Sequence, residues 1–224
     1  MHTGRIPGWI LIGGFVLSGV AGLLNVIALL GLQHPISHVT GNTSLFAMSL
    51  ARGDYGELRI TGLLVTMFFL GAVIGGFVVQ RSTARLGRRY GAALAIESVL
   101  LFAATFYLDR HNFAGIYVAA IACGLQNAMV TTYSGTIVRT THMTGVTTDI
   151  GIAVGHLLRG APVPPRYFLL LGSLFSGFAS GGVLGADLYV HYQFAALLLP
   201  ALMTGLVGVA YFIYKQAQRS LRIH

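Results

Sequence analysis

Two short polar stretches, each with a Thr-Gly pair, hold the residue types best suited to bind a solute. Residues 38–44 read HVTGNTS and residues 142–148 read HMTGVTT, and each stretch leads into a short apolar segment. Hydroxyl side chains suit helix N-caps, and the unpaired N–H groups of a first helical turn attract anions. We therefore predict a site for a small polar or anionic solute; the alternative is that Thr-Gly only caps two short buried helices. The expected N-cap residues are Thr40 or Thr43 and Thr144 or Thr147.

Amide side chains precede both stretches inside apolar segments, Asn25 before the first and Gln126 and Asn127 before the second. Such amides either line a site or join helices by hydrogen bonds, and both interpretations stay open. The candidate substrate-binding residues are Asn25, Thr40, Gly41, Asn42, Thr43, Gln126, Asn127, Thr144, Gly145, Thr147 and Thr148.

Asp149, expected in the first turn of the second short helix, is the strongest candidate for coupling transport to a proton or cation. A carboxylate within a membrane is costly, which makes a functional role the default interpretation. The aligned residue in the first stretch is Leu45, so this role would belong to one half only. The alternative is a carboxylate that only favours the helix dipole. His38 and His142 are further proton candidates, although a hydrogen-bonded structural role is favoured for both.

Glu97 lies in another apolar segment, where it either faces a cavity or, as we favour, pairs with an Arg of residues 81–89. No group of side chains has metal-site spacing, and Cys123 is the single cysteine. Phosphate-binding loops, nucleophile elbows and dinucleotide fingerprints are absent. We expect no cofactor, no metal and no catalytic residue; an intramembrane enzyme using Asp149 and His142 is the alternative.

The composition is that of a membrane protein. Charged residues make up 9% and hydrophobic residues 55% of the 224 residues, whereas soluble domains carry about 25% charged residues. A soluble enzyme, a disordered tail and a nucleic-acid-binding domain are therefore excluded. The net charge of +8 is then an orientation signal, because Lys and Arg accumulate in cytoplasmic loops. We expect one all-α polytopic transmembrane domain over residues 1–224.

The elements that must position these residues are six long segments and two short ones. A membrane helix needs about 20 apolar residues. The short segments, 43–51 and 147–158, would reach only about 14 and 18 Å at 1.5 Å per residue. We predict six transmembrane helices plus two short re-entrant or half-membrane helices. The long segments are expected at 8–32, 60–80, 91–108, 113–138, 167–186 and 194–214.

An internal repeat relates the two halves. His38 and His142 are 104 positions apart, and the FxGxxxGG pattern at 69–76 recurs at 175–182, 106 positions on. Small-xxx-small pairs such as Gly71/Gly75 favour packing within one subunit over a homodimer seam, which stays open. The predicted first repeat is 8–80, the linker loop and helix 81–112, the second repeat 113–188, and the closing helix and cytoplasmic tail 192–224.

The distribution of Lys and Arg predicts the topology. If the two short helices do not cross, 11 of the 14 basic residues fall on one side, and if both cross, the split is 5 against 9. The positive-inside rule favours the first arrangement, with both termini cytoplasmic. The two repeats are then inverted, a plan that recurs in secondary transporters with the substrate site near the midplane.

The stretches 34–43 (HPISHVTGNT), 124–128 (GLQNA) and 139–151 (RTTHMTGVTTDIG) resemble the YoaK family over nearly the whole chain. This resemblance implies a bacterial inner-membrane protein with about six crossings and a domain of unknown function. It implies no substrate.

We expect a permease or channel for a small polar or anionic solute, with a site near the bilayer midplane between the two Thr-Gly helices and an option of proton coupling. No ATP-binding domain is recognised, so uphill transport would need a gradient. The expected partners are the lipid bilayer and a small molecule, not nucleic acid. A non-transporting membrane scaffold or regulator is the other alternative.

Overall fold

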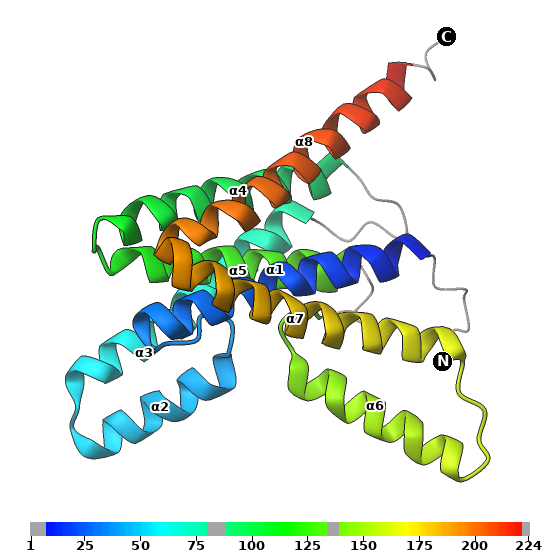
Figure 1. The fold of residues 1–224 in the computed structure, drawn as a ribbon, viewed down its shortest axis with the longest axis horizontal. Coiled ribbons are helices and arrows are strands. Elements are labelled where there is room, and N and C mark those ends of the chain that lie inside the picture. The colour runs from blue at the N-terminus through cyan, green and yellow to red at the C-terminus, as the bar shows by residue number, and fades with distance from the viewer. Residues whose placement is uncertain (1–7, 80–87, 134–138, 221–224) are drawn as a thin grey trace.

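The computed structural model describes residues 8–79, 88–133 and 139–220, and these form α-helices and one short 3-10 helix. No strand occurs in these three ranges. Figure 1 shows the long helices in a bundle in which successive members run in alternating directions, with two shorter helices on one side. The elements are α1 (Gly8–Leu32), α2 (Val39–Arg52), α3 (Tyr55–Val79), α4 (Arg88–Asp109), α5 (Ala114–Tyr133), α6 (Met143–Leu158), α7 (Pro165–Tyr192), η1 (Gln193–Leu197) and α8 (Leu198–Ser220).

The long helices are apolar enough to cross a membrane. Five stretches qualify by length and composition in the described ranges, and the last of them, Pro165–Ile213, runs through α7, η1 and most of α8. Large apolar side chains such as Phe77, Val183 and Leu206 are exposed on the outside of the bundle. The chain is therefore a helical, multi-pass membrane protein.

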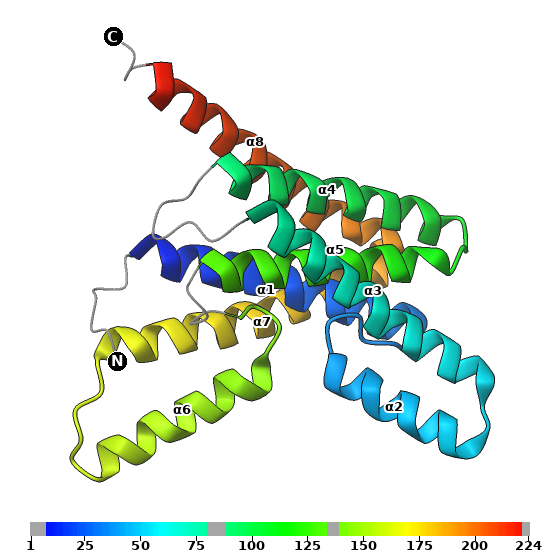
Figure 2. The ribbon, with the colours of Figure 1, turned by 180° about the vertical axis from the view of Figure 1, so that it is seen from behind.

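The helices α2 and α6 are short and splayed. They have 14 and 16 residues, or roughly 21 and 24 Å, less than the ~30 Å of a hydrocarbon core. Both begin near the middle of the bundle and run outward toward opposite ends, as Figures 1 and 2 agree. A glycine in the left-handed region follows each helix: Gly53 (φ 69°) is the C-cap of α2, and Gly160 (φ 73°) follows Arg159, the C-cap of α6. Glycine tolerates this backbone without strain, and it terminates the helix.

The bundle interlocks its two halves. Helix α1 packs along α7 and α3 along α5, while α4 packs between α5 and α8. Glycines allow these close crossings: a Cβ at Gly22 would overlap the backbone of Phe178, and one at Gly124 would overlap the backbone of Phe68. Small residues let helix backbones approach each other where no water-driven packing is available.

Several predicted boundaries are corrected. Helix α2 begins at Val39 rather than residue 43 and α6 at Met143 rather than residue 147. Helix α3 begins at residue 55, five residues before the predicted start, and α7 extends six residues beyond the predicted residue 186. Helix α5 ends at Tyr133, and the rest of the predicted segment, 134–138, lies outside the described residues. The early starts of α2 and α6 were not predicted because Thr and Gly in their first turns favour turns over helix. Tertiary packing overrides that local propensity here.

The predicted threonine N-caps are wrong. The N-cap residues are His38 and His142, and neither side chain makes a capping hydrogen bond. Thr40, Thr43, Thr144 and Thr147 lie inside the helices, where the Thr43 hydroxyl donates to the Val39 carbonyl at 2.9 Å. This back-bonding to residue i−4 replaces capping. Asp149 is consequently the seventh residue of α6 and lies in its second turn, not its first.

Candidate functional site: a cavity between the N-termini of α2 and α6

A cavity of about 460 Å³ lies where the N-termini of α2 and α6 face the bundle. Helices α1, α3, α5 and α7 supply the remaining wall. Among the described residues, no Asp or Glu lines it. The lining residues are Asn25, Ser37, His38, Val39, Thr40, Phe68, Asn127, Arg139, Thr141, His142, Met143, Thr144 and Phe178.

Twelve of these thirteen residues pair across the two halves of the chain. Residues 37–40 (SHVT) and 141–144 (THMT) correspond at a constant offset of 104, and the two asparagines at 102. Phe68 and Phe178 correspond through their contacts. Phe178 lies against Gly22 of α1, the helix that carries Asn25, and Phe68 lies against Gly124 of α5, the helix that carries Asn127. The remaining residue is Arg139, whose counterpart at the offset of 104 is Pro35. The site is thus a matched set of side chains plus one arginine.

The two helix N-termini have the same local geometry. The residues before them, His38 (φ −95°, ψ 71°) and His142 (φ −94°, ψ 63°), share one backbone conformation. The first helical bonds run from Asn42 N–H to the His38 carbonyl (3.0 Å) and from Val146 N–H to the His142 carbonyl (3.1 Å). The N–H groups of residues 39–41 and 143–145 therefore precede the hydrogen-bond ladder of each helix and carry the positive end of its dipole.

A glycine under each histidine makes room for the imidazole. A Cβ at Gly41 would lie 2.6 Å from His38 Nδ1, and a Cβ at Gly145 would overlap the ring of His142. Gly41 and Gly145 were predicted to bind solute directly. They act instead by allowing the two rings to fold over the first turn of α2 and α6.

The two asparagines are oriented by the polar segments opposite them. Asn25 Oδ1 accepts hydrogen bonds from Ser37, from its N–H at 3.2 Å and its hydroxyl at 2.9 Å. Asn127 Oδ1 accepts one from the Thr141 hydroxyl at 3.3 Å. With each oxygen engaged, the amide donors are the groups left for a ligand. Asn25 and Asn127 therefore both make hydrogen bonds to neighbouring segments and line the cavity.

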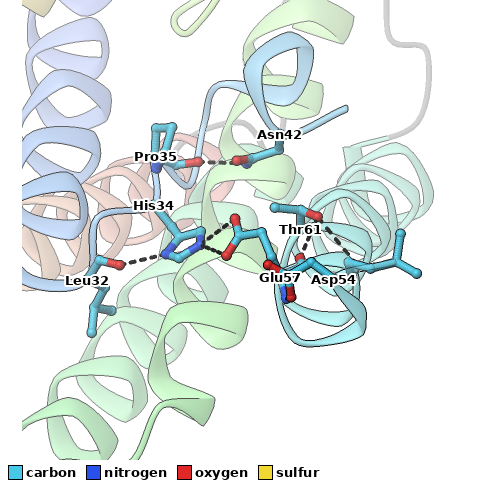
Figure 3. Close-up of polar contacts among 8 residues, drawn as sticks. Leu32, His34, Pro35, Asn42, Asp54, Glu57 and Thr61 are labelled. Carbon is cyan, nitrogen blue, oxygen red and sulfur yellow. Dashed lines mark hydrogen bonds and ion pairs between the residues drawn. The ribbon is translucent and has the colours of Figure 1, made fainter. Parts of the chain in front are cut away.

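A clasp holds the segment that leads into α2 (Figure 3). His34 Nε2 lies 3.0 Å from Glu57 Oε1, and His34 Nδ1 lies 2.6 Å from the Leu32 carbonyl oxygen. Asn42 Nδ2 donates to the Pro35 carbonyl at 2.7 Å. Asn42, predicted as a ligand-binding residue, thus braces the turn rather than lining the cavity.

The cavity brings together six of the predicted site residues. Asn25, Thr40, Asn127, Thr144 and both histidines line it. The remaining predicted residues lie elsewhere. Gln126 is buried behind the wall, and Thr43, Thr147 and Thr148 are exposed, with the Thr148 hydroxyl bonded to the Thr144 carbonyl. Asp149 is half-buried and outside the lining, on the side of α6 where it acts electrostatically on Tyr167.

Sequence reasoning missed the rest of the lining. Arg139 was counted only as an orientation signal, although its position three residues before His142 could have placed it at the site. Phe68 and Phe178 are indistinguishable by pattern from other membrane phenylalanines. Across the described ranges, no three His, Cys, Asp or Glu side chains gather as a metal site.

Comparison with known proteins identifies the family. The sequence model described as "Protein of unknown function (DUF1275)" matches residues 13–210. The chain belongs to the DUF1275 family. The resemblance to the YoaK family agrees with this match. No curated protein and no solved structure matches the chain. The DUF1275 match covers every residue of the cavity, so the matched pairs and Arg139 lie within the family domain.

Proposed function

We propose that this DUF1275 protein is a bacterial inner-membrane permease or channel for a small anion, with the cavity between α2 and α6 as the solute site. The observation that carries the proposal is the charge of the lining. Two helix N-termini, two histidines, two amides and Arg139 supply donors and positive potential, and the described part of the lining contains no carboxylate.

Electrostatics makes an anion the best-fitting solute. Each helix N-terminus is equivalent to about half a positive charge, and Arg139 adds a full charge through a guanidinium whose five N–H groups match planar oxyanions. The cavity of about 460 Å³ is within the range of small-molecule sites. The short helices beside it each pack on a single long helix among the described elements, α2 on α3 and α6 on α7.

The proposed membrane arrangement counts α7 and α8 as separate crossings, giving six, with α2 and α6 reaching only the midplane and both termini cytoplasmic. An inverted repeat underlies it. Matching contacts support this: Gly22 meets Phe178 and Gly124 meets Phe68, while Gly181 meets Gly19 and Gly71 meets Ile121. These contacts pair residues of α3 with residues of α7 that lie 110 positions later. The sequence alignment pairs residues 106 positions apart, so the two registers differ by about one helical turn. Inverted repeats with broken helices place substrate sites at such a centre.

A flux experiment tests the proposal. The purified protein is reconstituted in vesicles, and uptake of small inorganic and carboxylate anions is compared with uptake of matched cations. Wild type is expected to pass at least one anion and no cation. Arg139→Gln removes a charged hydrogen bond worth about 1.5–3 kcal/mol, so its apparent affinity should fall roughly 10- to 150-fold.

The matched control is Arg159→Gln, which removes the same charge from the exposed end of α6, outside the cavity. It should retain wild-type affinity. Selectivity for cations, or equal losses in the two variants, would overturn the proposal.

A further inference from the structure

Glu97 on α4 is a buried carboxyl with one oxygen unpartnered. Its side chain has no exposed surface. Oε1 accepts a hydrogen bond from Gln126 Nε2 at 2.9 Å, whereas Oε2 has no hydrogen-bond partner. The ion pair with an arginine that we favoured from sequence is therefore not formed with any described residue. When Glu97 is ionised, no described residue compensates its charge, and a proton that binds Oε2 removes that charge.

A chain of hydrogen bonds connects Glu97 to the cavity wall. Gln126 Oε1 accepts from the Thr140 hydroxyl at 3.3 Å. The Thr140 carbonyl in turn accepts from the Ser18 hydroxyl of α1 at 3.4 Å. Gln126, Thr140 and Ser18 are all buried. Thr140 stands between Arg139 and Thr141, and Gln126 precedes Asn127, so the two middle members of this chain adjoin residues that line the cavity.

We propose that Glu97 is the proton-binding group that couples anion movement to a proton gradient, acting on the cavity through Gln126 and Thr140. The inference rests on the proposed function. One proton binds Oε2 for each anion that enters, so the carboxyl becomes neutral as the anion arrives. Glu97 takes the coupling role that the sequence suggested for Asp149, which is not among the described residues that line the cavity.

The amide of Gln126 reports the protonation of Glu97. An ionised carboxylate accepts only, so it requires the amide N–H, as observed at 2.9 Å. A protonated carboxyl can instead donate to the amide oxygen. That exchange reverses the amide and turns its NH2 group toward Thr140, whose hydroxyl now donates to the amide oxygen and would then have to accept. Proton binding at Glu97 therefore changes the hydrogen bond that holds the segment carrying Arg139 and Thr141.

Few other titratable groups face Glu97. One is the Cys123 thiol on α5, on which Glu97 acts electrostatically. The described side chains of α8 include one titratable group, Tyr211, which packs on Tyr90 seven residues before Glu97. Tyr117 on α5 and Tyr55, Glu57 and Arg59 on α3 belong to the end of the bundle where those helices begin. Helix α1 and η1 contribute none among the described side chains.

The test compares Glu97→Gln with Asp149→Asn. In vesicles, a pH gradient should drive anion accumulation by wild type and Asp149→Asn but not by Glu97→Gln. Exchange of labelled for unlabelled anion needs no net proton movement, and Glu97→Gln should retain it within about threefold of wild type. Glu97→Asp, which restores a carboxyl, should recover gradient-driven uptake in part.

A direct measurement removes dependence on vesicles. When the transported anion is added to solubilised wild-type protein in weak buffer, the protein should take up about one proton for each anion it binds. A pH-sensitive dye follows this uptake. Glu97→Gln should bind the anion and take up none. Gradient-driven uptake by Glu97→Gln, or loss of proton uptake in Asp149→Asn alone, would overturn the assignment. Absence of any anion binding by wild type would instead overturn the proposed function.

Discussion

Two glycines of α3 differ only in what surrounds them, so exchanging each for alanine isolates the α3–α5 crossing. Gly71 is buried, and a Cβ there would overlap the Ile121 carbonyl of α5. Gly76 is exposed, with nothing within 4 Å of the same atom. Forcing a methyl group into a packed interface costs about 1–3 kcal/mol. Alanine at an open helical position instead stabilises by about 0.5–1 kcal/mol. The two variants should therefore differ by roughly 1.5–4 kcal/mol and have opposite signs.

Thermal unfolding in detergent measures this difference. For a chain of this size each 1 kcal/mol moves the midpoint by about 2–4 °C, so Gly71→Ala should unfold roughly 3–16 °C below Gly76→Ala. The same comparison on α7 uses Gly181→Ala, which meets the Gly19 backbone, and Gly172→Ala, which meets nothing. If the members of each pair shift together, the interlocked packing of α1 on α7 and α3 on α5 is refuted.

Two further variants test how the cavity wall is held. Asn25→Ala leaves the buried Ser37 N–H and hydroxyl without their acceptor, so it should lose about 1–3 kcal/mol, measured as a fall in unfolding midpoint. Asn127→Ala breaks a single 3.3 Å bond and should lose less; a larger loss there would contradict the hydrogen bonding described. His34→Ala should lower the midpoint by about 1–4 °C, because a partly exposed pair such as His34–Glu57 contributes roughly 0.5–1 kcal/mol. His191 is an exposed histidine whose ring bonds to the Asp187 carbonyl of its own helix, so His191→Ala should leave the midpoint unchanged. Equal shifts in the two variants would contradict a stabilising role for the contacts of His34.

Much of the helical framework follows from the sequence because long charge-free runs have few alternatives in a membrane. The segment 8–32 is predicted to the residue. The starts of α2 and α6 are misplaced because threonine and glycine normally signal turns, whereas here the first turn forms against the bundle. The sequence alignment of α3 with α7 also differs from the structure by about one turn. The small residues recur every four positions, so the two helices can be aligned in two registers one turn apart.

The candidate site is predictable where the repeat exposes it and not elsewhere. His38/His142 and Thr40/Thr144 are found because they match in sequence. Arg139 is missed because it has no match. Glu97 is recognised from the sequence, but its link to Gln126 and Thr140 is not, because these residues come from elements distant in the chain. Asp149 draws attention as a charge near a Thr-Gly stretch, but helical rotation carries it out of the cavity lining.

The central claim, that the cavity concentrates anions, is tested most directly by charge-paired thiol reagents. Thr40→Cys and Thr144→Cys each place a thiol on the lining, and the native Cys123 is 1% exposed and should stay unmodified. Rates are measured with a negatively charged sulfonate and a positively charged trimethylammonium methanethiosulfonate, each relative to a free thiol in solution. We predict that the anionic reagent reacts faster at both positions by about tenfold or more, a difference of ~1.4 kcal/mol. Equal rates, or a faster reaction with the cationic reagent, would contradict the account.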